Sequence, residues 1–257
     1  MLLRSMLTHP LIRGLDPDDP RTAIRRQELL ASKAFLKQIY SEWYGRMVAS
    51  LGGIEGPFLE IGSGGGFLKR VLPAVMTTDL MVIPGLSAVS DAHRLPFGNA
   101  SIGGILMNSV LHHLASARRF LNEAARVMKP GGILVMNEPW VSCWSSFVYR
   151  WLHHEPFDPK AREWATPAGG PLTAANSALP WIIFRRDRDV FERELAEWRL
   201  VGIRPHTPFR YLLSGGVSMR SLAPPWTCNM WRILEGWLEP WMSALAMFAM
   251  ITLERRA

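Results

Sequence analysis

A series of alternating glycines follows a short apolar segment in the first third of the sequence. Phe58 to Ile61 reads as a short buried strand, and Gly62, Gly64 and Gly66 follow at every second position. Glycine adopts the backbone conformations that a tight turn requires, and the missing Cβ lets a ligand lie directly on the peptide groups. The apolar residues that come next predict a helix beginning at about Gly66, whose positive end faces the turn. The stretch therefore predicts a ligand-binding turn.

An acidic residue, Glu60, lies two positions before the first glycine and gives the pattern Glu-x-Gly-x-Gly-x-Gly. The dinucleotide-binding fingerprint does not call for an acid there, because it places a pyrophosphate at the helix N-terminus. A carboxylate suits a cationic ligand instead. The pattern resembles the first motif of the class I S-adenosylmethionine-dependent methyltransferases, and a glycine-rich loop of another α/β protein is the alternative. The resemblance implies that the turn holds the methionine part of the cofactor, with the acid near its ammonium group, through Glu60, Gly62, Ser63, Gly64 and Gly66.

Two further carboxylates follow predicted strands. Met76 to Asp79 reads as a second strand, and Asp79 lies 17 residues past Gly62. This spacing resembles that of the ribose-binding acid of such folds, because a strand-end carboxylate accepts bonds from both ribose hydroxyls; an exposed turn aspartate is the alternative. Leu86 to Ser90 predicts a third strand, and the string after it, Asp91-Ala-x-x-Leu-Pro-Phe, resembles the family's adenine-binding segment. The cofactor contacts implied here are Asp79, Leu80, Asp91 and Ala92.

The next stretch extends the resemblance. Ser101 to Met107 predicts a fourth strand, Ser116 to Met128 a helix, and Ile133 to Asn137 a fifth strand. The sequence between Val110 and Gly132 is similar to the UbiE/type 11 branch of this superfamily, and the resemblance covers about residues 57–139. Strands that alternate with helices at this spacing independently indicate an open, mostly parallel sheet, with ligands beyond the carboxyl ends of the strands.

We therefore predict an α/β fold, a Rossmann-like three-layer sandwich with a mostly parallel seven-stranded sheet, an N-terminal helical arm and a C-terminal helical elaboration. Residues 1–52 form the arm and a helical cap over the cofactor pocket, with Asp19 as the N-cap of a helix that has Pro20 in its first turn. Residues 53–139 form the cofactor-binding core. Residues 140–257 supply a substrate-recognition insertion, closing strands and C-terminal helices.

Beyond Pro139 the family signal fades and the chain becomes rich in Trp and Pro. A short helix is predicted near residues 144–152 within irregular segments, and the last helix packed on the sheet near residues 189–197. Residues 198–206 and 209–213 read as an antiparallel closing pair. Residues 226–253 read as one or two helices broken at Pro240.

The composition is that of an ordinary globular protein. The chain has 257 residues, of which 48% are hydrophobic and 20% charged, which suits one large domain or one domain with an appended lobe. Its net charge of +7 suits an anionic partner such as nucleic acid or an anionic membrane surface. The basic residues are scattered, so we expect no nucleic-acid partner. Cys143 and Cys228 are far apart in the sequence and read as buried, reduced thiols.

Neither end of the sequence indicates a membrane-spanning segment. The apolar run at residues 1–7 is too short for a signal peptide. The longest apolar segment, Trp241 to Leu253, has thirteen residues, fewer than the ~18 to 20 that span a bilayer. We expect a cytoplasmic protein and leave open a peripheral contact with the inner membrane surface.

Methyl transfer from a sulfonium needs mainly alignment of donor and acceptor, and a base only where the acceptor must lose a proton. His112 and His113 follow the fourth strand, and the ordinary pKa of histidine suits base work. Glu138, at the end of the fifth strand, is the next candidate catalytic residue. Loop capping and a structural carboxylate are the alternatives for these residues. Asn108, at the end of the fourth strand, is a further cofactor-binding candidate.

The sequence does not favour a metal site. His153, His154, Glu155 and Asp158 resemble a metal-binding cluster superficially. Adjacent histidines on a helix point in different directions, and no further ligand spacing supports zinc. We therefore predict no metal ligands.

The C-terminal third of the chain contains nine of its eleven tryptophans. Four of them form a stripe with methionine and phenylalanine, which we expect to be packing core, with a substrate entrance or a membrane contact as the alternative. The stripe consists of Trp226, Trp231, Trp237, Trp241, Met242, Met247, Phe248 and Met250.

These observations predict an S-adenosylmethionine-dependent methyltransferase with a small-molecule, lipid or glycan acceptor that the sequence does not identify. A catalytically silent cofactor-binding or assembly protein and an NAD(P)-dependent oxidoreductase are the alternatives. The oligomeric state stays open.

Overall fold

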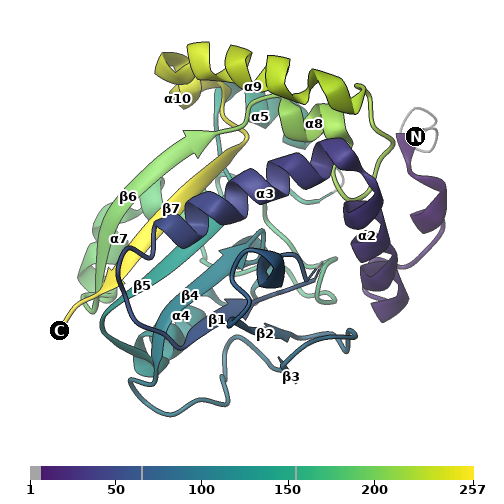
Figure 1. Cartoon of the computed structure of the whole chain (residues 1–257). Coiled ribbons are helices and arrows are strands. Elements are labelled where there is room, and N and C mark those ends of the chain that lie inside the picture. The colour runs from purple at the N-terminus through teal and green to yellow at the C-terminus, as the bar shows by residue number, and fades with distance from the viewer. Residues whose placement is uncertain (1–6, 65, 154) are drawn as a thin grey trace.

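The computed structural model describes residues 7–64, 66–153 and 155–257, and these build one seven-stranded sheet with helices on both faces (Figure 1). The strand order is β3-β2-β1-β4-β5-β7-β6. The first five strands are parallel, and β7 is antiparallel to both of its neighbours. The strands are β1 (Phe58–Ile61), β2 (Met76–Asp79), β3 (Ala88–Val89), β4 (Ile102–Asn108), β5 (Met128–Pro139), β6 (Trp198–His206) and β7 (Phe248–Arg255).

Three sequence features fall outside the described residues. They are the N-terminal residues 1–6, where we expect no signal peptide, Gly65 of the glycine-rich turn, and His154 of the discounted metal-binding cluster.

Alternating side chains of the central strands build a core on each face of the sheet. In β4, Ile105 and Met107 pack in one cluster, whereas Leu106 between them packs in the other. The same alternation separates Leu134 from Val135 in β5. Because successive side chains of a strand point to opposite faces, strands that are apolar at every position require cover on both sides. The expected three-layer α/β architecture is thereby confirmed.

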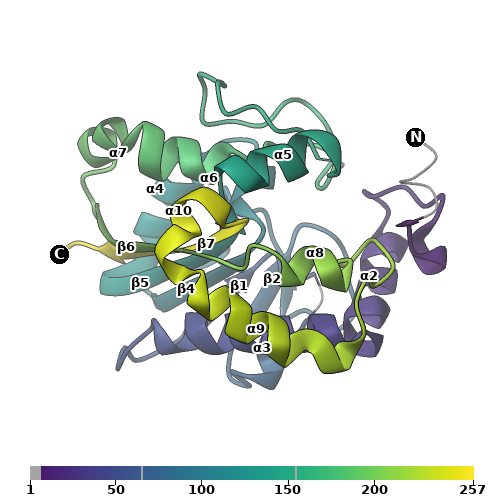
Figure 2. The ribbon, with the colours of Figure 1, turned by 90° about the horizontal axis from the view of Figure 1, so that it is seen from above.

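The helices form the two outer layers, as the view from above shows (Figure 2). One face carries α4 (Ala117–Val127), α6 (Leu179–Trp181), the π-helical turn η4 (Ile182–Arg186) and α7 (Arg188–Glu194). The other carries α2 (Pro20–Ser32) and α3 (Ala34–Ala49). At the carboxyl ends of the strands lie α5 (Cys143–Trp151), α8 (Arg210–Ser214), α9 (Cys228–Trp237) and α10 (Met242–Leu245). Short 3₁₀ turns are η1 (Pro10–Ile12), η2 (Leu68–Arg70), η3 (Leu111–His113), η5 (Pro225–Thr227) and η6 (Glu239–Trp241).

The N-terminal arm begins its first long helix where the sequence predicts. The side chain of Asp19 accepts a hydrogen bond from the backbone amide of Arg21, and Pro20 occupies the first helical position. The amphipathic pattern of the arm resolves into α2 and α3. Leu30 of α2 and Leu36 of α3 are buried against the sheet, which fixes both helices beside the glycine-rich turn.

The expectation of a helix that begins at about Gly66 is wrong. Only the three-residue 3₁₀ helix η2, from Leu68 to Arg70, follows the turn. Pro73 accounts for this difference, because proline lacks an amide donor and disfavours helical backbone in the residue before it. The turn therefore has no long helix whose dipole could stabilise a ligand.

The C-terminal assignments also need correction. Residues 210–214 form the helix α8 where we expected a strand, and the antiparallel partner of β6 is β7, from residues that we expected to be helical. The segment Phe248 to Leu253 is apolar at nearly every position because β7 lies inside the sheet, between β5 and β6. Such a continuous run has the period of neither a helix nor a half-buried strand.

The tryptophan stripe divides between core and surface. Met242, Met247, Phe248 and Met250 are buried, as expected of packing core. Trp226, Trp237 and Trp241 are exposed, with 79%, 74% and 58% of their surface accessible, so the expectation that they form core is wrong. They lie on or beside α9, whose other face packs on the protein through Cys228 and Trp231.

A buried arginine joins the N-terminal and C-terminal helices. The guanidinium of Arg210 in α8 donates to Glu235 of α9 at 2.5 Å and to Glu42 of α3 at 2.7 Å. Arg210 and Glu235 are only 4% and 5% exposed. A buried arginine between two carboxylates holds its partners strongly, because removing it leaves the buried Glu235 without a cationic partner, although Glu42 keeps its ion pair with Arg46.

We expect Arg210→Ala to lower the free energy of unfolding by about 3 to 5 kcal/mol. The exposed pair of Arg199 with Glu254 provides the matched control, and Arg199→Ala should cost about 1 kcal/mol or less. Urea denaturation of both variants measures the difference. Equal losses in the two variants would contradict the role given to Arg210.

Candidate functional site

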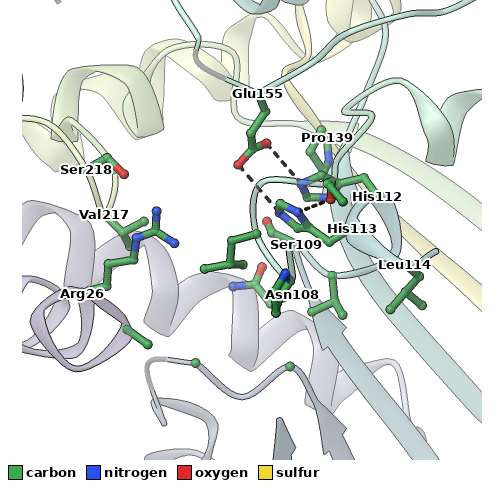
Figure 3. A pocket seen from close by; sticks show the side chains of 18 of the residues that line it. Arg26, Asn108, Ser109, His112, His113, Leu114, Pro139, Glu155, Val217 and Ser218 are labelled. Atoms are coloured by element: carbon green, nitrogen blue, oxygen red, sulfur yellow. Dashed lines mark hydrogen bonds and ion pairs between the residues drawn. The ribbon is translucent and has the colours of Figure 1, made fainter. Parts of the chain in front are cut away.

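A cavity of about 580 Å³ opens at the carboxyl ends of the parallel strands. This volume lies within the ~300 to 1,000 Å³ typical of small-molecule sites. The glycine-rich turn, the ends of β2 and β4, helix α2 and the segments on either side of α5 contribute to its wall. Figure 3 shows Arg26 on one side of this cavity and Glu155, His112 and His113 on the other.

The glycine-rich turn has the backbone that the sequence predicts. Gly62, Gly64 and Gly66 have φ angles of +68°, +33° and +59°, which disfavour any residue with a side chain. A Cβ on Gly62 would lie 2.4 Å from a methyl carbon of Val110, so this glycine is needed for packing. At Gly64 the nearest such contact is a carbonyl oxygen at 3.9 Å, so the space above it is open and the turn presents bare backbone to the cavity. Gln27 of α2 donates to the Gly64 carbonyl and holds the turn in place.

Glu60 lies beneath the turn, buried and outside the cavity wall. The hydroxyl of Tyr44 in α3 donates to its carboxylate at 2.9 Å. Burial raises the pKa of Glu60 to about 7, against the lowering effect of the Tyr44 bond. Ser63, also buried, lines the cavity directly.

The two predicted strand-end aspartates both reach the cavity. Asp79 is buried, and its oxygens accept bonds from the amides of Gly64 at 3.0 Å and Met81 at 2.9 Å. A carboxylate has about four lone-pair sites, so Asp79 keeps capacity for ligand hydroxyls. Asp91 is more exposed and bonds the amide and ring of His93. Two neighbours of these acids, Leu80 and Ala92, also line the cavity.

Glu138 connects the ends of β4 and β5. Its carboxylate is fully buried and accepts hydrogen bonds from the amides of Val110 and Leu111, both at 2.8 Å, and lies 2.7 Å from Nδ1 of His112. Asn108 lines the cavity beside this turn and accepts a bond from Asn137 of β5. The structure thus brings the three catalytic candidates together, with Glu138 behind the histidines and outside the cavity wall.

The two histidines meet a carboxylate from a distant part of the chain. Glu155, four residues past α5, lies 3.3 Å from Nε2 of His112 and 3.7 Å from Nε2 of His113 (Figure 3). The other ring nitrogen of His113 lies 3.2 Å from the carbonyl oxygen of Ala174. The hydroxyl of Ser177 donates to the Glu155 carboxylate. These contacts form a polar cluster at one end of the cavity.

Burial and neighbouring charges shift the pKa values of the two histidines in opposite directions. Burial alone would lower the pKa of His112, but the bonds and charges of Glu138 and Glu155 outweigh it and raise that pKa to about 9. Burial and the neighbouring His112 lower the pKa of His113 to about 3. Burial would raise the pKa of Glu155, but the histidines hold it well below its usual range. At neutral pH this cluster therefore contains a charged His112 and a neutral His113.

Sequence reasoning missed two residues of the cavity. Arg26 of α2 points into it, and its Nε is buried without a hydrogen-bond partner among the described residues. The sequence around Arg26 predicts an amphipathic helix, and it does not distinguish this residue from an arginine on the surface. In the sequence Glu155 belongs only to the superficial metal pattern, because no local signal places it against His112 and His113, which lie more than 40 positions earlier.

These features fit the S-adenosylmethionine implied by the sequence. The open backbone of Gly64 accepts a close ligand, Asp79 keeps acceptor capacity for hydroxyls, and Arg26 offers a donor for a carboxylate. None of them requires a change in the fold.

Comparisons with known proteins also indicate a methyltransferase domain. Residues 59–136 match the family described as methyltransferase domain. A segment of 51 residues is 45% identical to an uncharacterized 37.1 kDa protein in transposon TN4556 of Streptomyces fradiae, and the match spans 20% of this chain and only 15% of that protein.

Solved structures of other proteins are similar to this chain. Geranyl diphosphate methyltransferase in complex with SAM is 14% identical, with a TM-score of 0.50 over 94% of this chain and 93% of that chain. Geranyl diphosphate C-methyltransferase from Streptomyces coelicolor A3(2) is 13% identical, with a TM-score of 0.49 over 97% and 89%. At 14% identity the likeness to the first of these structures concerns the fold alone.

We predict that Gly64→Val abolishes cofactor binding while the protein stays folded. The valine side chain would enter the open space at the turn, where it meets no packed neighbour, and the positive φ adds a strain of about 1 to 2 kcal/mol. Titration with S-adenosylhomocysteine, alongside circular dichroism, measures both effects. Unchanged affinity in a folded variant would remove the turn from the cofactor site.

Replacing either strand-end aspartate should weaken cofactor affinity by roughly 1.5 to 3 kcal/mol, about tenfold or more. We expect the larger loss for Asp79→Ala, because this carboxylate also holds the amide of Gly64. Calorimetric titration of Asp79→Ala and Asp91→Ala with S-adenosylhomocysteine provides the measurement. If both variants bind as tightly as the parent, these residues do not contact the cofactor.

Proposed function

We propose that this chain, whose residues 59–136 match the methyltransferase-domain family, transfers the methyl group of S-adenosylmethionine to an apolar or amphiphilic acceptor, a lipid or lipid-like small molecule reached from a membrane surface. The observation that carries the acceptor class is the wall of the cavity away from the glycine-rich turn. Much of that wall is aromatic or aliphatic, through Tyr40, Val148, Tyr149, Tyr211, Met247 and Phe248.

S-adenosylmethionine, when bound, supplies a methyl group already activated by its positive sulfur. The protein then has to hold the acceptor in line with that methyl and to exclude water, and such alignment can contribute about 7 to 11 kcal/mol. The apolar wall suits both tasks, because it desolvates an acceptor without competing hydrogen bonds. The transfer itself forms a bond from the acceptor to the methyl carbon, breaks the carbon–sulfur bond and releases S-adenosylhomocysteine.

The polar end of the cavity is suited to bind the reacting group of the acceptor. His112, His113 and Glu155 are the polar groups that gather there, and an acceptor hydroxyl or carboxyl would find its hydrogen-bond partners among them. Glu138 lies behind His112 and bonds the turn that carries it. We therefore give Glu138 a positioning role, and the cavity-lining histidines the contact with the acceptor.

The exposed stripe of α9 supports access from a membrane. Met230, Ile233 and Trp237 recur at intervals of three and four residues, so they share one face of α9, and Trp226 precedes them in the turn η5; all four are more than half exposed. An outward apolar face of this kind is typical of a helix that lies in a lipid interface. No described helix is long and apolar enough to cross a bilayer.

The charge of the chain favours an anionic surface. Its net charge is +7, and Arg232 of α9 and Lys37 of α3 are exposed beside the stripe's helix. Lysine and arginine near an anionic surface contribute about 1 kcal/mol each, and salt weakens this attraction. The stripe and the charge together favour anionic lipid over neutral lipid.

We expect the protein to co-sediment with vesicles that contain phosphatidylglycerol at low salt, and less with phosphatidylcholine vesicles. The double variant Trp226→Ser/Trp237→Ser should bind about tenfold or more weakly, because two exposed indole rings no longer enter the interface. The control is Val201→Ser, at an apolar position on β6 that is also exposed, with 51% of its surface accessible. S-adenosylhomocysteine affinity should be the same in all three proteins.

The acceptor class is tested by a labelled-methyl assay against cell extracts separated into lipid, glycan and polar small-molecule fractions. The proposal expects label in the lipid fraction. Label in a polar metabolite, together with equal sedimentation of parent and double variant, would contradict it. Cofactor binding without label in any fraction would favour a catalytically silent cofactor-binding protein.

A further inference from the structure

The polar end of the cavity has the arrangement of a metal centre. Of the residues that the structure describes, His112, His113 and Glu155 bring three potential ligand atoms within 4.8 Å of one another. Two imidazoles and one carboxylate form a common ligand set for divalent transition-metal ions. All three residues line the cavity, so the remaining coordination positions would face it.

The outer nitrogens of both histidines are oriented as in metal-bound histidines. Such ligands almost always donate their second ring N–H to a carboxylate or a backbone carbonyl. Nδ1 of His112 lies 2.7 Å from Glu138, and Nδ1 of His113 lies 3.2 Å from the carbonyl oxygen of Ala174. Both bonds leave the Nε2 atoms facing Glu155.

The distances around Glu155 are longer than those of charge-assisted hydrogen bonds. Its oxygens lie 3.3 Å from Nε2 of His112 and 3.7 Å from Nε2 of His113. Charge-assisted hydrogen bonds are about 2.7 to 2.9 Å long, the length that His112 makes to Glu138 on its other side. Ligand atoms held ~2.1 Å from one metal ion lie about 3.0 to 3.4 Å apart, a range that includes the His112 distance, whereas the His113 distance would have to shorten by about 0.3 Å on binding.

The lone pairs of His113 and Glu155 also favour a bound cation. A carbonyl oxygen only accepts hydrogen bonds, so Nδ1 of His113 carries the proton and Nε2 presents a lone pair to Glu155. Two acceptors that face each other in a buried site repel, and in the metal-free chain only the positive charge of His112, between Glu138 and Glu155, offsets this repulsion. A divalent ion would replace that charge and balance both carboxylates with both histidines neutral.

The geometry points to a binding site for a divalent transition-metal ion, such as Zn²⁺ or Fe²⁺, held by Nε2 of His112, Nε2 of His113 and the carboxylate of Glu155. Nitrogen ligands favour these ions over Mg²⁺ and Ca²⁺, which prefer sites made of oxygen alone. Glu138 and Ser177 support the ligands from behind, through His112 and Glu155 respectively.

The open positions of the ion would take an oxygen of the acceptor. This role rests on the proposed function, because it requires that an acceptor occupies the same cavity. Metal binding itself is independent of it and can be measured without an acceptor or a cofactor.

The test is calorimetric titration of the chelator-stripped full chain with Zn²⁺, followed by Co²⁺, whose visible absorption reports nitrogen coordination. We expect one ion per chain, and no competition from millimolar Mg²⁺. Glu155→Gln and His113→Asn should each weaken binding by more than the ~10 to 100-fold typical of losing a supporting residue. His9→Ala, which removes a histidine that does not line the cavity, should bind the ion like the parent.

Titration with S-adenosylhomocysteine shows that each variant is folded, since the cofactor occupies the other end of the cavity. If Glu155→Gln fails this check, His113→Asn decides. Stoichiometric Zn²⁺ binding lost in the variants supports the site. No binding by the parent, or equal binding by the parent and a folded variant, overturns it, and retained cofactor binding would then leave the methyltransferase function standing.

Discussion

The carboxylate of Glu138 fixes the edge of the sheet at which the cavity opens. It is fully buried at the end of β5, and it accepts bonds from two amides of the turn after β4 and from His112. A buried charge is tolerated only when such donors surround it, so the turn and the histidine are held in one arrangement. The relative position of β4 and β5 is set by their parallel register. The polar end of the cavity therefore depends on a carboxylate that does not itself reach the cavity wall.

The core of the fold could be predicted because its signals are local. The strand before Gly62, the glycines with positive φ and the helix after Ser116 each follow from neighbouring residues. The expected architecture and the resemblance to class I methyltransferases are both confirmed over this region. The same locality explains the failure after Gly66, where the apolar period indicated a helix and Pro73 prevented it. There the proline, a second local signal in the sequence, outweighed the helical period of the apolar residues.

Other features could not be predicted because they depend on contacts between distant segments. Residues 248–255 form a strand only because β5 and β6 lie on either side of them. Arg26 and Glu155 enter the cavity from helices and loops whose packing no pattern in the sequence specifies. The exposure of Trp226 is a further case, since an apolar helix face is usually buried and only the folded chain shows which face is covered. The roles of all these residues stay predictions.

The two ends of the cavity are supported by different parts of the chain. The turn end is held by local backbone and by α2 and α3, through Gln27 and Tyr44. The apolar wall is built largely by residues 140–257, which also supply Glu155 to the polar end and reach the cap through the buried charges of Arg210. Substitutions in that second region change the shape offered to an acceptor without touching the glycine-rich turn. Such a division lets acceptor choice vary while the cofactor site stays constant, provided that the Arg210 contacts keep the two regions in register.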